Sequence, residues 1–192
     1  CGLTTSELVE HTFAAVNDAL AERKEAPIGW DTLHLNIPHL SEHYYGNTAS
    51  KAKDGFGGEV HRGEIAAALR LAASRTKGGG ASAMRAVERI YRSEAMRYLA
   101  QEKMSITCSA LLSTAYLSEK GDVYPCTIWD RPLGNVRTTG YALMPLIEAA
   151  RRDGVRRAVA ERRCPNCWTP CEAYPAIGAS PVRSLLALVR GG

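Results

Sequence analysis

Five of the six cysteines lie in the second half of the chain, and this clustering limits the possible folds and sites more than any other feature. They stand at positions 108, 126, 164, 167 and 171, and only Cys1 precedes them. A disulfide-stapled domain spreads its cysteines along a small chain and usually follows a secretory signal, which the first residues lack. The pattern instead indicates metal ligands kept reduced, so we expect a cytoplasmic protein.

Composition excludes several classes of protein. Of the 192 residues, 45% are hydrophobic and 23% are charged, as in a globular chain and unlike a disordered, collagen-like or coiled-coil one. No apolar stretch is long enough to span a membrane. The net charge of +4 is concentrated in residues 151–163, where six arginines accompany two acidic residues. We interpret this segment as a solvated helix face and expect neither a nucleic-acid nor a membrane partner.

Residues 1–104 follow a rhythm of helix, short loop and strand. Thr4 and Glu7 form a capping box that starts a helix reaching about Lys24, and residues 32–37 alternate apolar and polar as a strand does. Further along, we expect a long polar loop over residues 38–63 and helices over residues 64–74 and 82–103. This order is typical of a β/α barrel or an open α/β sheet.

Polar side chains of the expected strand are candidates for a substrate site. His34 and Asn36 share one face, which would line the lumen of a barrel; hydrogen bonding within the fold is the alternative. In the following loop, we expect His39, His43 and His61 to be solvated, with a lid over the substrate as the alternative.

After residue 104 the pattern changes, and we place a domain boundary there, with domains 1–104 and 105–192. Residues 110–117 predict a strand, and residues 123–124 begin a returning strand. Such a hairpin would bring Cys108 and Cys126 together. A helix over residues 141–163 then leads to the remaining cysteines, and a short helix over residues 181–190 ends the chain.

The candidate metal ligands are thiols from two distant segments. A C-x2-C element places two sulfurs on one tight turn, and the hairpin supplies two more. The candidate set is Cys108, Cys126, Cys164, Cys167 and Cys171. We expect Trp168 to shield the centre from water, with simple packing as the alternative. Arg162 and Arg163 would offset the negative charge of a thiolate-bound cluster, unless they only solvate the helix.

The combined spacing resembles a known domain. Cys108-x12-Gly121-x4-Cys126, the Gly134-Asn135 pair and the C-x2-C-x3-C element resemble the auxiliary-cluster domain of radical S-adenosylmethionine (radical SAM) proteins, called SPASM or, in its shorter form, Twitch. The resemblance covers about residues 105–175. It implies an α/β fold: the C-terminal portion of a partial (β/α) barrel, followed by a small α+β auxiliary-cluster domain with a β-hairpin and helices.

The resemblance also implies ligands. Cys108 and Cys126 would bind an auxiliary [4Fe–4S] cluster, and the other two ligands would come from Cys164, Cys167 and Cys171. The thiols are too few for two complete clusters, so one Twitch-like cluster is expected; a second, incompletely ligated cluster is the alternative. Its expected role is electron transfer or substrate placement.

The C-x3-C-x2-C motif that holds the catalytic cluster of radical SAM enzymes is absent from these residues. As given, the chain is therefore not expected to cleave S-adenosylmethionine, which would bind only the complete enzyme. It looks like the C-terminal part of a longer enzyme, or one half of a split one. Its expected partners are the N-terminal radical SAM portion and a peptide or small-molecule substrate.

A structural zinc module acting as a binding protein is the alternative from another class. Four cysteines with a C-x2-C knuckle suit zinc by ligand count. Cys108 and Cys126 do not form the second knuckle that such modules usually have, because they are far more than three residues apart.

Overall fold

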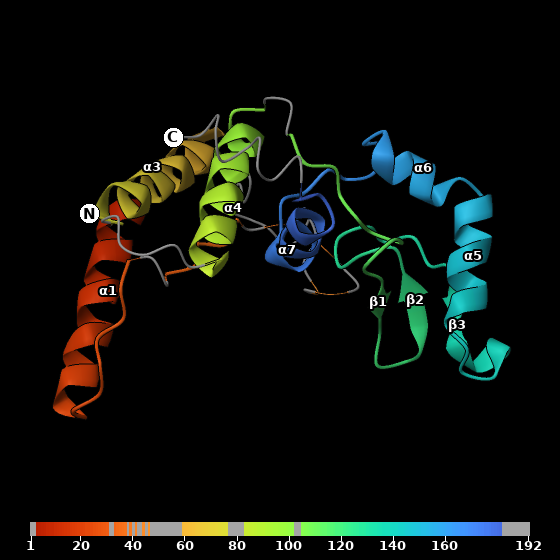
Figure 1. The fold of residues 1–192 in the computed structure, drawn as a ribbon, viewed down its shortest axis with the longest axis horizontal. Coiled ribbons are helices and arrows are strands. Elements are labelled where there is room, and N and C mark those ends of the chain that lie inside the picture. Colours follow the sequence, from red (N-terminus) through yellow and green to blue (C-terminus); the bar gives the residue numbers. More distant parts are fainter. Residues whose placement is uncertain are drawn as a thin grey trace.

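The computed structural model describes residues 3–30, 33–37, 39, 41, 44, 46, 59–76, 83–101 and 105–181. The chain forms an arch of helices with one small sheet (Figure 1). On one side lie α1 (Thr5–Glu22), α3 (Glu59–Arg75) and α4 (Ala83–Leu99). The other side holds the sheet, the 3-10 helix η1 (Val136–Thr139), α5 (Met144–Arg152) and α6 (Val155–Ala160), and α7 (Pro170–Gly178) lies between the two sides. None of the described helices is long and apolar enough to cross a lipid bilayer.

The predicted capping box of α1 is confirmed. The Thr4 hydroxyl accepts the Glu7 N–H at 3.3 Å, and the Glu7 carboxylate accepts the Thr4 N–H at 2.8 Å. The helix ends close to the predicted position, because Lys24 adopts a left-handed backbone with φ of 57°. No residue of α1 is fully buried; Phe13 instead stacks on Trp30, with ring centroids 4.1 Å apart.

The main core lies between α3, α4 and α7. Leu69 of α3, Tyr91 of α4 and Ala176 of α7 are each at most 1% exposed and belong to one cluster. Trp168, just before α7, is buried in the same cluster. The core therefore includes residues from both sides of the predicted boundary. On α4 the apolar Tyr91 and Leu99 are buried, whereas Met84, in the first turn, is 71% exposed.

The strand predicted at residues 32–37 is wrong for the described stretch 33–37, which belongs to no strand. Its carbonyl groups find side chains of α4 instead of a neighbouring strand. The Leu33 oxygen accepts Arg92 at 2.7 Å, and the Leu35 oxygen accepts the Tyr91 hydroxyl at 3.4 Å. Among the described residues the one sheet is antiparallel, so the partial barrel stays a prediction.

The hairpin is present but shorter than predicted. Strand β1 is Tyr116–Leu117, and it pairs with β2 (Asp122–Tyr124); β3 (Gly134–Asn135) adds a third antiparallel strand that we did not predict. The first part of the predicted strand 110–117 turns back on itself, because Leu111 has a φ of 64° and its N–H bonds the Thr114 oxygen at 2.7 Å.

Two further boundaries differ from the predictions. The helix predicted over residues 141–163 is divided into α5 and α6 at Gly154, whose φ of 77° interrupts a right-handed helix. Residues 59–63, predicted as loop, form the first turn of α3. The helix predicted over 181–190 lies outside the described residues beyond Pro181.

The two glycines on which the resemblance rests, Gly121 and Gly134, both have a positive φ, which favours glycine. Gly121 has a φ of 88°, at the turn between β1 and β2. Gly134 has a φ of 141°, and a Cβ atom added there would lie 2.8 Å from Cδ2 of Leu146. A side chain at residue 134 would therefore combine backbone strain with a clash.

This arrangement yields a stability prediction. Gly134→Ala should destabilise the chain by about 2–4 kcal/mol, because strain of roughly 1–3 kcal/mol adds to the cost of moving Leu146. Gly140→Ala is the matched control, since Gly140 has a φ of 62° but no atom within 4 Å of an added Cβ. Urea unfolding of both variants measures the difference, and equal losses would contradict the role given to Leu146.

Candidate metal centre

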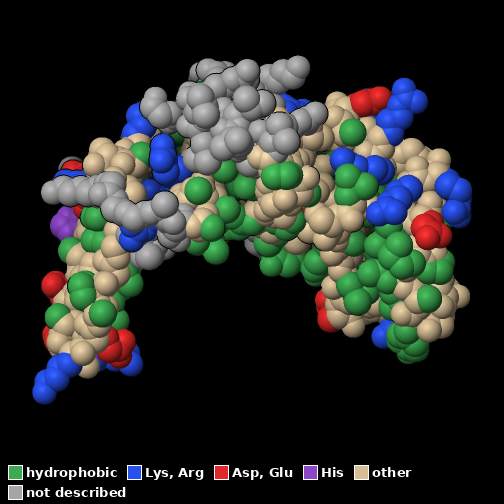
Figure 2. All heavy atoms as spheres, viewed as in Figure 1, with side chains coloured by type: hydrophobic (Ala, Val, Ile, Leu, Met, Phe, Trp, Pro, Cys, Tyr) green, Lys and Arg blue, Asp and Glu red, His purple; other side chains and the backbone are tan. Residues whose placement is uncertain are grey.

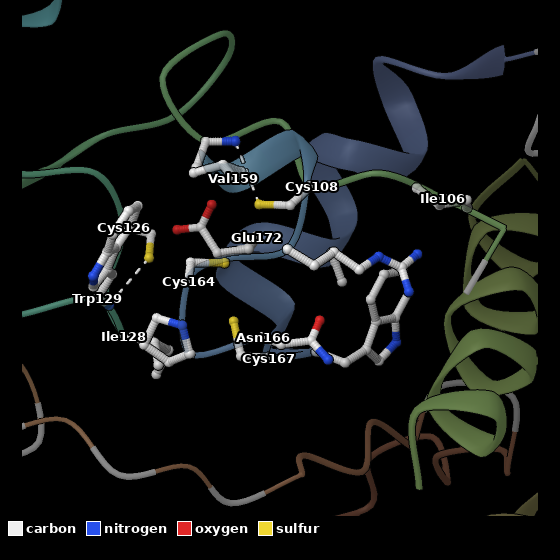
Figure 3. A pocket seen from close by; sticks show the side chains of 15 residues that line it. Ile106, Cys108, Cys126, Ile128, Trp129, Val159, Cys164, Asn166, Cys167 and Glu172 are labelled. Atoms are coloured by element: carbon white, nitrogen blue, oxygen red, sulfur yellow. Dashed lines mark hydrogen bonds between the residues drawn. The ribbon is translucent and has the colours of Figure 1, made fainter. Parts of the chain in front are cut away.

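Four of the five predicted thiols line one pocket. Figure 3 shows the sulfurs of Cys108, Cys126, Cys164 and Cys167 around a common space. The cavity measures about 30 Å³, far below the roughly 300–1,000 Å³ of pockets for organic ligands. None of the described cysteines is paired in a disulfide. The pocket is therefore the size for an inorganic centre.

Cys171 does not belong to this group. It is exposed, stands in the first turn of α7 and does not line the pocket. The structure thus divides the predicted set into four thiols that meet and one that faces solvent.

Loop geometry and backbone amides orient the sulfurs. Cys108 precedes the turn at Leu111, and its Sγ accepts the Ala110 N–H at 3.4 Å. Cys126 follows β2, and its Sγ accepts the Trp129 N–H at 3.2 Å. In the C-x2-C turn, Asn166 takes a left-handed φ of 49°, a conformation that asparagine tolerates well. Amide N–H groups that point at sulfur stabilise its thiolate form.

The pocket is apolar apart from a few groups, and this controls the protonation of its thiols. Its walls include Ile106, Ile128 and Val159. Burial raises the pKa of Cys108 to about 11 and that of Cys126 to about 12, and it raises the pKa of Cys167 well above its usual value. Without a cation these thiols stay neutral. A bound metal supplies the compensating positive charge, so binding would release protons.

Glu172 is a pocket residue that the sequence analysis missed. It is 5% exposed, and its carboxylate points toward the same space as the sulfurs (Figure 3). It accepts the Thr114 hydroxyl at 2.7 Å and a backbone N–H from Thr127. Burial raises its pKa to about 6. A glutamate in a helix carries no sequence signal of its own, because only the folded hairpin reveals its partners.

The two arginines predicted beside the centre behave differently. Arg162 lines the pocket. Arg163 instead binds Glu161 at the surface, with Nη2 and the carboxylate 2.6 Å apart. A third arginine, Arg156, donates to the Cys108 carbonyl oxygen at 2.8 Å and fastens α6 to the loop before the hairpin. Positive charge at the pocket therefore comes from Arg162 in its lining and from Arg156 beside Cys108.

No single-ion site is formed in the described part of the chain, since no group of three His, Cys, Asp or Glu side chains there could hold one metal ion. A zinc ion with Zn–S bonds of about 2.3 Å requires sulfurs about 3.8 Å apart in a tetrahedron. The four thiols line one pocket but are not gathered into such a tetrahedron.

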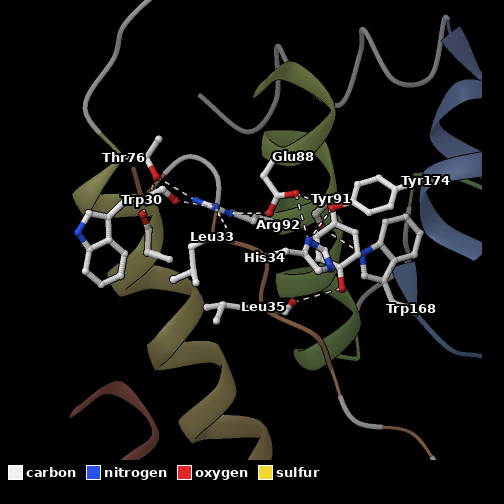
Figure 4. A network of polar contacts seen from close by, with 11 residues as sticks. Trp30, Leu33, His34, Leu35, Thr76, Glu88, Tyr91, Arg92, Trp168 and Tyr174 are labelled. Atoms are coloured by element: carbon white, nitrogen blue, oxygen red, sulfur yellow. Dashed lines mark hydrogen bonds and ion pairs between the residues drawn. The ribbon is translucent and has the colours of Figure 1, made fainter. Parts of the chain in front are cut away.

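The predicted strand residue His34 belongs to a polar network beside the pocket (Figure 4). The Tyr174 hydroxyl donates to Glu88 at 2.6 Å and lies 2.6 Å from Nδ1 of His34. Burial opposes ionisation of Glu88, but hydrogen bonds from His34, Tyr174 and Arg92 outweigh it and lower the pKa of Glu88. These contacts favour the interpretation of His34 as a hydrogen-bonded structural residue; for Asn36 no contact supports a substrate role.

Trp168 joins this network to the thiol pocket. Its indole N–H donates to the Tyr91 oxygen at 2.9 Å, and its ring stacks on that of Tyr91 with centroids 5.9 Å apart. Its backbone N–H approaches Nε2 of His39 at 3.4 Å. His39 was expected to be solvated, and that expectation is wrong, since burial lowers its pKa to about 4. His43 and the side chain of His61 lie outside the described residues.

The chain was compared with known protein families, curated proteins and solved structures. The chain matches no protein-family model, no curated protein and no solved structure.

The first prediction from the site concerns thiol reactivity in the metal-free chain. The exposed Cys171 should react readily with iodoacetamide, whereas at pH 8 a thiol with an ordinary pKa of 9.0 should react about 100-fold faster than Cys108 and about 1,000-fold faster than Cys126, because their raised pKa values reduce the thiolate fraction. Mass spectrometry of labelled peptides resolves the rates residue by residue. Labelling of Cys126 as fast as Cys171 would contradict the buried pocket.

The second prediction concerns Glu172. Its folded pKa of about 6 exceeds the ordinary value of 4.5, so the neutral carboxyl stabilises the fold fully below pH 4.5, and this stability is lost as pH rises through 6. Between pH 4.5 and pH 7.5 the stability of the metal-free wild type relative to Glu172→Gln should fall by roughly 2 kcal/mol, because the other titrating groups are common to both chains. Urea unfolding at several pH values tests this. The exposed Glu161→Gln should keep the wild-type slope; an unchanged slope in Glu172→Gln would refute the assignment.

Proposed function

We propose that this chain binds one [4Fe–4S] cluster through Cys108, Cys126, Cys164 and Cys167 and forms the auxiliary-cluster part of a radical SAM enzyme. The observation that carries the proposal is the meeting of four thiols, from segments far apart in sequence, on one small pocket. Cysteine thiolates are the usual ligands of such clusters. The exposed Cys171 is then the spare thiol.

The sequence spacing and the backbone contacts of the sulfurs support a cluster more than a zinc module. Cys108 and Cys126 are too far apart in sequence to form the second knuckle that such a module usually has. The N–H groups of Ala110 and Trp129 that point at Cys108 and Cys126 match the amide–sulfur bonds that tune cluster potentials.

The surrounding residues suit the charge of such a centre. A cluster with four thiolates carries about two negative charges when oxidised. Arg162 lies at the pocket and offsets part of this charge. Thr114 and Thr127 hold the Glu172 carboxyl, and the negative charge of a bound cluster would raise its pKa further above about 6. Trp168 and the apolar walls keep water from the sulfurs.

The cluster, when bound, would supply one-electron redox chemistry or hold a substrate in place. The chain's own residues bind it, exclude water and set its electrostatic surroundings. With four cysteine ligands, no iron is left open for S-adenosylmethionine, so that reaction needs a C-x3-C-x2-C portion from elsewhere. Within this proposal, the substrate is a peptide or small molecule, and the compartment is a reducing one such as the cytoplasm.

Metal analysis of the protein tests the proposal. After anaerobic reconstitution with iron and sulfide, the chain should hold about four iron and four sulfide per molecule and absorb broadly near 400 nm. A colourless protein that keeps about one zinc per chain would replace the cluster with a structural zinc site. A protein that binds neither metal would refute both assignments.

Cysteine variants test the ligand set. Cys108→Ser and Cys167→Ser should lose most of the bound iron, because each removes a thiolate from the pocket. Cys171→Ser is the matched control, since it changes an exposed cysteine four residues beyond the C-x2-C turn, and it should keep the wild-type iron content. If Cys171→Ser loses as much iron as Cys108→Ser, the four-ligand assignment is wrong.

A further inference from the structure

A second cavity lies between α3 and α4. Its volume is about 580 Å³, within the range of pockets that hold small organic molecules. We call it the arginine groove, because Arg70, Arg89, Arg92 and Arg97 line it. It shares no lining residue with the thiol pocket. An inference about the groove therefore goes beyond the proposed function and stands or falls without it.

The groove is positively charged. None of the described residues that line it is acidic. Figure 2 shows Lys and Arg side chains over α3 and beside α4. The donor groups of Arg92 already have partners within the fold, since Arg92 binds Glu88 at 2.9 Å and the carbonyl oxygens of Trp30 and Leu33 at 3.1 and 2.7 Å. Its charge is compensated, and it acts as a fixed part of the wall.

Two of the other three arginines are uncompensated. Neither Arg70 nor Arg89 has a hydrogen-bond or ion-pair partner in the described part of the chain, and both are exposed. Arg97 lies 3.6 Å from the fully buried carboxylate of Glu94, so its charge is compensated as that of Arg92 is. Guanidinium groups on one groove repel one another, and an anion between them removes that repulsion. Their planar donor groups suit phosphate and carboxylate oxygens.

The groove also has an apolar part. Ala73 and Ala100 are exposed and Met96 is partly buried, and these three line the groove together with the buried Leu69. Thr76 and Ser93 add hydroxyl groups among these side chains. A simple inorganic anion would leave the apolar part in contact with water. An organic molecule with an apolar body would use both parts.

We infer that the arginine groove binds a small organic dianion, such as a phosphate ester or diphosphate, whose apolar body rests on Ala73 and Met96. The anionic groups pair with Arg70 and Arg89. The size of the cavity and its confinement to two helices favour a small molecule over a polymer, since the chain as a whole carries a net charge of only +4.

Fluorescence titration with trinitrophenyl-ADP, an organic dianion with an apolar body, tests the inference. The full chain should bind the probe saturably, and ADP should displace it at least about tenfold better than pyrophosphate or adenosine, because only ADP carries both parts. Adenosine as effective as ADP would reduce the groove to an apolar patch, and pyrophosphate as effective as ADP would reduce it to an anion site. Either result, or the absence of saturable binding, overturns the inference.

Variants locate the binding. Arg89→Gln removes one cation, and Ala73→Glu places a negative charge at an exposed position of the groove; each should weaken probe binding about tenfold or more. Arg152→Gln is the matched control, because it removes the same charge from an exposed helical position on α5 and should bind as the wild type does. Circular dichroism confirms that each variant is folded. Equal weakening in Arg152→Gln, or none in both groove variants, would place the probe elsewhere.

Discussion

The burial of several thiols in one apolar pocket is the constraint on which the rest of this structure depends. Ionising Cys108 in that pocket costs roughly 3 kcal/mol more than in water, since its pKa rises from 9.0 to about 11. Cys126 and Cys167 are shifted in the same direction. A chain gains little stability from grouping such side chains, and a metal centre that binds their thiolates gives the arrangement a physical reason.

The pocket is held by contacts that link the two halves of the chain. Trp168 follows the C-x2-C turn directly and packs into the core of α3, α4 and α7. Its indole N–H binds the Tyr91 oxygen, and Tyr174 of α7 binds Glu88 of α4. On the other side, Arg156 of α6 binds the carbonyl group of Cys108. The sulfurs are therefore attached to helices on both sides of the arch, which limits how far they can move apart.

Sequence reasoning succeeded where the signal is local. The capping box at Thr4 and Glu7 acts within one turn of helix, and the turn around Gly121 sits between two short strands, so both could be predicted. The meeting of the two thiol segments was predicted from spacing alone, and the structure brings four of the five sulfurs to one pocket. The exposure of Cys171 could not be predicted, because it depends on how α7 packs.

Where the hydrogen-bond partners of a residue come from distant segments, the sequence pattern predicted the wrong structure or gave no prediction. Residues 33–37 alternate as a strand does, but Arg92 and Tyr91 of α4 take their carbonyl groups. In the sequence His39 resembles a solvated loop histidine, yet its ring accepts the Trp168 N–H. Glu172 becomes a pocket residue only through its hydrogen bonds with Thr114 and Thr127 of the hairpin region.

X-ray absorption spectroscopy of anaerobically purified protein tests the central claim most directly. The account predicts an iron edge with sulfur ligands and a clear iron–iron scattering path; a zinc edge with four sulfurs and no iron would contradict it.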